Sequence, residues 1–110
     1  MNWLSNLIPD TPDSTSPAWS EDALFLDVRT PGEYASGHVG GALNLPLEHF
    51  VQNYASVAPD KSKQIVLYCR SGVRSGQAMQ FLRQQNYENV VNGGSVGEVA
   101  LRTSRPIRRH

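Results

Sequence analysis

Cysteine is scarce in this chain, which has 110 residues and only one of them, Cys69. A single thiol cannot form an internal disulfide, and it excludes a zinc site built from several cysteines. Cys69 is therefore either buried filler in the core or a reactive group. The residues around it have to decide between these two roles.

An excess of charge of either sign is also absent, because ten Lys and Arg balance ten Asp and Glu. No overall basic field attracts nucleic acid or a membrane surface, so we expect neither as a partner. Long apolar runs are lacking too. Residues 1–13 contain no Lys or Arg and are interrupted by Pro9, which does not fit a signal peptide. We expect a cytoplasmic protein, or a periplasmic one where a leader has been removed.

What remains is the composition of one folded domain, with 39% hydrophobic and 18% charged residues. Residues 1–20 are rich in Pro, Ser and Thr and predict a loosely ordered lead-in. Residues 21–101 form the expected domain. Residues 102–110 hold four arginines and predict a basic tail, either solvated, folded back on the acidic N-terminal segment, or used for docking. The small size favours a monomer.

Within the domain, short apolar runs alternate with helical patterns, which indicates an α/β fold with mostly parallel strands. We expect strands at 23–28, 64–68 and 88–92, and a helical spacing at 47–54. Thr30 and Glu33 form a capping box around Pro31 and predict a short helix there. Ser75 is the expected N-cap of a helix after the second strand, and a weak final helix follows through 99–101.

Cys69 stands at the carboxyl end of the second strand, just before a tight loop. Ligands of open α/β sheets bind at such strand ends, near the amides of helix starts. A helix dipole and the neighbouring Arg70 and Arg74 favour a thiolate, and the same groups suit an anionic substrate. Gly72 permits the close backbone turn that such a loop needs. A lone cysteine after an apolar strand is more often inert, but this neighbourhood favours a reactive thiol.

Three ordered motifs resemble the rhodanese-like sulfurtransferases. The first comprises LDVRTPGEY, GHV and GALNLP (residues 26–34, 37–39 and 41–46), and the second is the loop CRSGVRS (69–75). The third combines NYENV (86–90) with the glycines at 93–94. Two features of this closing segment differ from those of many relatives: Asn92 precedes the glycine pair, and no Trp follows it. The segment is similar to that of the small phage-shock sulfurtransferases.

The resemblance implies a five-stranded, mostly parallel sheet flanked by helices on both faces. It implies that Cys69 is the nucleophile and carries sulfane sulfur as a persulfide. The donor, thiosulfate or another anion, is expected to contact the loop formed by Arg70, Ser71, Gly72, Val73 and Arg74. The acceptor is expected to be cyanide or a thiol, such as that of a thioredoxin-like protein. Neither a metal nor an organic cofactor is needed for this covalent chemistry.

Two other functions stay open. The domain can act as a persulfide relay or a regulatory module, in which thiosulfate turnover is incidental. Cysteine phosphatases and arsenate reductases share the layout of strand, cysteine, loop and helix, but their arginine lies one position farther from the cysteine than Arg74 does here. The tighter loop leaves little room for a tetrahedral oxyanion.

The polar residues of the first motif are expected to have structural roles. Asp27, Arg29, Glu33 and His38 resemble catalytic residues by type, but turn-placed polar groups in a domain core are normally satisfied locally. We therefore expect them to hold the strand-to-helix turn through ion pairs and backbone hydrogen bonds.

Overall fold

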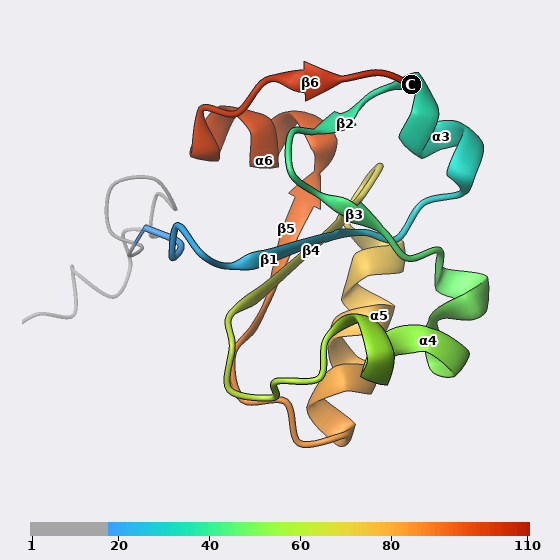
Figure 1. Ribbon diagram of the computed structural model, residues 1–110, viewed down its shortest axis with the longest axis vertical. Coiled ribbons are helices and arrows are strands. Elements are labelled where there is room, and N and C mark those ends of the chain that lie inside the picture. The colour runs from blue at the N-terminus through green and yellow to red at the C-terminus, as the bar shows by residue number, and fades with distance from the viewer. Residues whose placement is uncertain (1–17) are drawn as a thin grey trace, which may run out of the picture.

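A four-stranded parallel sheet organises residues 18–110, the part of the chain that the computed structural model describes (Figure 1). Its strands are β1 (Leu24–Asp27), β3 (Leu43–Asn44), β4 (Ile65–Cys69) and β5 (Val90–Ser95), in the order β3-β1-β4-β5. A separate antiparallel pair joins β2 (His38–Val39) to β6 (Ile107–Arg108). The predicted α/β fold with a parallel sheet is confirmed, although two strands lie outside the main sheet.

Helices cover both faces of the sheet, as the sequence predicted. One face carries α4 (Phe50–Val57) and α5 (Val73–Gln84), and the other carries α6 (Val96–Thr103) (Figure 1). The short α3 (Pro31–Ser36) follows β1, and the 3-10 turn η1 (Leu47–His49) leads into α4.

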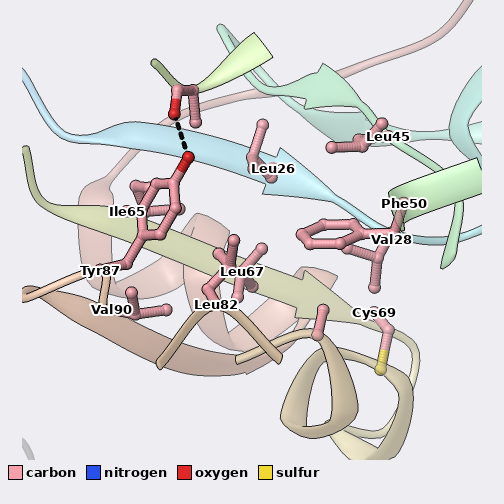
Figure 2. Close-up of a cluster of buried hydrophobic side chains, with 12 residues drawn as sticks. Leu26, Val28, Leu45, Phe50, Ile65, Leu67, Cys69, Leu82, Tyr87 and Val90 are labelled. Carbon is pink, nitrogen blue, oxygen red and sulfur yellow. Dashed lines mark hydrogen bonds between the residues drawn. The ribbon is translucent and has the colours of Figure 1, made fainter. Parts of the chain in front are cut away.

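The central strand β4 explains why the sheet has a core on each side. All five of its residues are buried, as expected for a strand covered on both faces. Ile65 and Leu67 point into the cluster beneath α4 and α5, which Figure 2 shows. Val66 and Tyr68 point into the smaller cluster beneath α6. The alternation follows from the two-residue period of a strand.

Both short helices that flank the strands begin as their sequences require. Thr30 caps α3 by accepting from the Glu33 backbone N–H at 3.2 Å, and the Glu33 carboxylate accepts from the Thr30 N–H at 3.0 Å. Ser95 and Glu98 form the same box at the start of α6. The prediction that Ser75 caps α5 is wrong. The helix begins at Val73, three residues before the start that an N-cap at Ser75 would give, because Gly72 adopts the N-cap position.

A bulge at Gly93 shapes the end of β5. Asn92 is opposite Leu67 and Gly94 is opposite Tyr68, which leaves Gly93 as the extra residue. A Cβ at Gly93 would lie 2.7 Å from Val99. Only glycine therefore fits where β5 presses against α6.

Residues 102–110 pack on the domain and do not form a separate tail. Arg102 and Thr103 complete α6, and β6 then pairs with β2. Arg105 lies 4.4 Å over the Phe25 ring, and the His110 N–H donates to the Ala35 carbonyl at 2.9 Å. Stacking of Arg105 on an aromatic ring and the pairing of β6 with β2 hold these residues against the domain. The expected lead-in is described only from residue 18, and residues 1–17 lie outside the described part.

No helix within residues 18–110 has the length and apolar character needed to cross a membrane.

Candidate active site

Cys69 is the last residue of β4, and its sulfur lies at the start of α5. The strand has a partner on both sides, β1 and β5, so main-chain hydrogen bonds fix the position of Cys69. Its side chain belongs to the cluster beneath α4 and α5 and is fully buried, with 0% of the residue exposed (Figure 2). The sequence placed this residue correctly, at a strand end that faces a helix start.

Hydrogen bonds converge on the sulfur from the loop and from α5. The Gly72 N–H donates to Sγ at 3.0 Å, and the Ser75 hydroxyl lies 3.5 Å from it. Gly72 has φ 93°, a left-handed conformation that favours glycine, and this turn directs its N–H back toward the cysteine.

The surroundings of Cys69 favour its thiolate. Burial raises the pKa of this thiol, but hydrogen bonds from Ser75 and from the backbone of Ser71 and Gly72 outweigh burial and lower the pKa to about 7. The dipole of α5 acts in the same direction. The thiolate, which is the nucleophilic form of cysteine, is therefore more populated at neutral pH than for an ordinary thiol.

A second layer of hydrogen bonds ties the loop to β5 through Asn92. Its Nδ2 donates to the Gly72 carbonyl at 2.9 Å, and its Oδ1 accepts from the Ser75 hydroxyl at 2.7 Å and from the Gly94 N–H at 3.0 Å. Sequence reasoning noted Asn92 only as a departure from the family pattern. Its position in the sequence could have indicated this role. Asn92 lies near the carboxyl end of a strand, and the carboxyl ends of neighbouring parallel strands meet at the same edge of the sheet as the Cys69 loop.

The two arginines of the loop are in different surroundings. Arg70 is exposed, and its side chain makes no hydrogen bond or ion pair with another residue in the described range. Arg74 forms a two-point ion pair with Glu33, at 2.8 and 3.0 Å. Arg74, together with the hydrogen bonds from Thr30, lowers the pKa of Glu33 to about 2. The sequence did not reveal this pair, because its partners are 41 residues apart.

The other candidate contacts, Ser71 and Val73, are exposed at the rim of the loop, and Val73 is 66% exposed. They border a groove of about 1590 Å³ that continues along the edge strand β5, past Asn92, to Trp19 and Arg105. Of the loop residues, Ser71, Gly72 and Val73 line this groove, whereas Arg74 lines a separate pocket beside Thr30 and Cys69 is buried beneath the loop.

Asp27, Arg29 and His38 of the first motif have local partners, as expected, whereas Glu33 bonds both the nearby Thr30 and the distant Arg74. Asp27 and Arg29 form a buried ion pair at 2.6 Å, and the Arg29 guanidinium also donates to the Gly37 carbonyl at 2.6 Å. His38 is 3% exposed, and its Nδ1 lies 2.8 Å from the Tyr34 carbonyl. These groups shape the turn between β1 and β2.

No cluster of three or more His, Cys, Asp or Glu side chains in residues 18–110 is arranged to hold a metal ion. The Cys69 sulfur, with the Gly72 N–H and the Ser75 hydroxyl beside it, is arranged for covalent chemistry on that atom.

The parallel sheet and the cysteine loop at its carboxyl edge define an α/β domain of the kind that performs covalent chemistry on a thiolate. The sequence model for the rhodanese-like domain matches residues 7–97, and the chain belongs to that family.

Known relatives agree with this assignment. The chain is 38% identical to the thiosulfate sulfurtransferase PspE of Escherichia coli K12 over 77 residues. This aligned region covers 70% of this chain and 74% of PspE. The chain is 47% identical over 73 residues to a sulfurtransferase of Allochromatium vinosum, covering 66% of each.

A solved structure described as rhodanese with anions from E. coli superposes with a TM-score of 0.72 at 34% identity, covering 80% of this chain and 99% of that one. Together, the family and these relatives support sulfurtransferase activity.

Proposed function

We propose that this protein transfers sulfane sulfur from thiosulfate, or another anionic donor, to cyanide or a thiol through a persulfide on Cys69. The observation that carries the proposal is the Cys69 sulfur itself, which accepts from the Gly72 N–H at 3.0 Å and has a pKa lowered to about 7. PspE, which is named as a thiosulfate sulfurtransferase, supports the choice of donor.

The first step forms the persulfide. The Cys69 thiolate attacks the outer sulfur of thiosulfate, the S–S bond of thiosulfate breaks, and sulfite leaves with the bonding electron pair. Because Cys69 is fully buried in this structure, loop 70–72 has to move before the donor reaches Sγ. Arg70, whose guanidinium is exposed, meets the anion at the rim of the loop.

Arg74 stabilises the same negative charge from a fixed position, since Glu33 holds its guanidinium. In the second step, cyanide or a thiolate attacks the terminal sulfur of the persulfide and restores the Cys69 thiolate. The two steps need no redox partner and no cofactor.

The test is the intact mass of the reduced protein before and after incubation with thiosulfate. We expect a gain of one sulfur atom that cyanide removes, and no gain in Cys69→Ser. Absence of an adduct on the wild-type protein would show that thiosulfate is not the donor. Hydrolysis of an aryl phosphate that depends on Cys69 would instead favour the phosphatase alternative.

One observation favours a persulfide relay as a second candidate. The groove beside the loop, at about 1590 Å³, exceeds the roughly 300–1,000 Å³ of pockets for small molecules. A thioredoxin-like protein acceptor would use such space, whereas cyanide would not. Fast transfer from persulfidated Cys69 to a protein thiol, alongside slow turnover of thiosulfate and cyanide, would support the relay.

The cytoplasmic location expected from residues 1–13 stays a prediction. Fractionation of cells that express the native gene tests it directly. Recovery of the protein in the periplasmic fraction would contradict it.

A further inference from the structure

Asn92 occupies a position on β5 from which its side chain faces the catalytic loop. It is opposite Leu67 in the parallel register, so its side chain lies on the same face of the sheet as those of Leu67 and Cys69. This is the face that α5 covers. Because β5 is the edge strand and Asn92 is exposed to solvent, packing alone does not explain an asparagine here.

The orientation of the Asn92 amide follows from its partners. The Gly72 carbonyl can only accept, so it faces Nδ2, and the Gly94 N–H can only donate, so it faces Oδ1. A rotated amide would place Oδ1 against the Gly72 carbonyl oxygen and Nδ2 against the Gly94 N–H, so that acceptor would face acceptor and donor would face donor. One side chain therefore joins the loop, the first turns of α5 and the end of β5 in a single arrangement.

We propose that Asn92 is a positioning residue for Cys69. Asn92 holds Gly72 in the conformation in which the Gly72 N–H donates to Sγ of Cys69. Gly72 is a glycine in the left-handed region, and without a Cβ it has other conformations open to it. The Gly72 carbonyl accepts from the Gly76 N–H in the first turn of α5 and from Asn92 Nδ2, each at 2.9 Å, and Asn92 supplies the one of these two bonds that ties the loop to β5. Restraining Gly72 keeps the 3.0 Å contact from its N–H to the sulfur.

Asn92 also affects the sulfur through Ser75. The Ser75 hydroxyl has one proton, and its oxygen lies 2.7 Å from Asn92 Oδ1 and 3.5 Å from Sγ. The two acceptors share this proton, so loss of Asn92 would leave it wholly to the sulfur and lower the pKa of the thiol further. Loss of the Gly72 restraint would raise the pKa. These two consequences oppose each other, so the test has to remove one of them.

The experiment compares Ser75→Ala with Ser75→Ala/Asn92→Leu. The rate of alkylation by iodoacetamide is measured against pH, and the midpoint reports the pKa of Cys69, because the chain has no other cysteine. With the hydroxyl absent from both proteins, the two differ in the restraint on Gly72 and in the bond from the Gly94 N–H to Asn92 Oδ1, which does not involve the loop. We expect Asn92→Leu to raise the midpoint by ~0.5–1 pH unit and to increase the rate limit at high pH, since the loop then uncovers the sulfur.

A matched control separates positioning from general loss of stability. Tyr87→Phe in the same Ser75→Ala background removes the hydrogen bond from the Tyr87 hydroxyl to the Ala58 carbonyl at 2.5 Å. Tyr87 lies at the opposite end of the buried cluster from Cys69 (Figure 2). We expect Tyr87→Phe to lower the melting temperature and leave the midpoint unchanged.

An unchanged or lower midpoint in the Asn92→Leu protein would overturn the proposal and leave Asn92 a purely structural role. The inference rests on the proposed role of Cys69 as the nucleophile. Alkylation, however, needs no sulfur donor, so its outcome is independent of the persulfide test. Failure of one experiment therefore does not decide the other.

Discussion

The ion pair between Glu33 and Arg74 fastens α3 to the start of α5, and the substitution Glu33→Gln isolates the energy of that contact. Glutamine keeps the size of the side chain and an oxygen that accepts from the Thr30 N–H, so the capping box is retained. The substitution removes the negative charge and replaces Oε2, which accepts from Arg74 Nη2 at 3.0 Å, with an NH2 group that cannot accept. We expect Glu33→Gln to reduce the free energy of unfolding at neutral pH.

The magnitude is bounded by the pKa of Glu33, which Arg74 and, to a lesser extent, the hydrogen bonds from Thr30 lower from 4.5 to about 2. For two fully buried charges this drop would correspond to roughly 3 kcal/mol. The side chains of Arg74 and Glu33 are 32% and 28% exposed, however, and solvent screens such pairs. We therefore expect a loss of about 1 kcal/mol, measured by urea unfolding at pH 7.

The pH dependence gives the prediction its sign. The pKa of Glu33 is lower in the folded than in the unfolded state, so the pair contributes fully at pH values above 4.5. The contribution is lost as the pH falls from 4.5 toward about 2, because Glu33 becomes protonated. The stabilities of the wild-type and Glu33→Gln proteins should therefore converge in acid.

Glu98→Gln is the matched control, because it makes the same change in the capping box of α6. Glu98 accepts from the Ser95 N–H at 2.9 Å, but it forms no ion pair with any residue from 18 to 110. We expect a change within about 0.5 kcal/mol. Equal losses in the two variants, or a Glu33→Gln difference that persists unchanged in acid, would refute the reasoning.

Three further predictions concern the loop and the core. Arg70→Ala should raise the KM for thiosulfate several-fold in steady-state assays, whereas Arg83→Ala, on an exposed position of α5, should not. Gly93→Ala places a Cβ 2.7 Å from a methyl group of Val99 and should reduce the free energy of unfolding in urea by about 2 kcal/mol or more. Gly32→Ala, whose Cβ would have no atom within 4 Å, should leave it unchanged. Leu82→Ala, at a fully buried position, should cost about 3 kcal/mol, and a loss under about 1 kcal/mol would contradict the packing described for α5.

The sequence was sufficient to predict the elements whose signals are local. The apolar run of β4 and the capping box at Thr30 depend on neighbouring residues, and both are found where they were expected. Cys69 follows from the same argument, since a strand end and a helix start are visible in the chain order. The assignment of Ser75 as an N-cap failed for a local reason, because a left-handed Gly72 starts the helix sooner.

Contacts between distant parts of the chain were beyond local patterns. The pairing of Glu33 with Arg74 and that of Ser75 with Asn92 each depend on how the sheet brings separate turns together. The pairing of β6 with β2 depends on tertiary structure in the same way, which is why residues 102–110 read as a tail. Charge and composition describe such residues but do not show which partner each one meets.

The position of Cys69 on an interior strand has a consequence for how the family can diversify. Strands on both sides hold the backbone of β4, whereas loop 70–72 and the edge strand β5 each have a side that faces solvent. Substitutions at that rim can alter which donor or acceptor is accepted while the attacking atom stays in place. Under the proposed function, the position of the attacking sulfur and the choice of donor or acceptor therefore depend on separate parts of the chain.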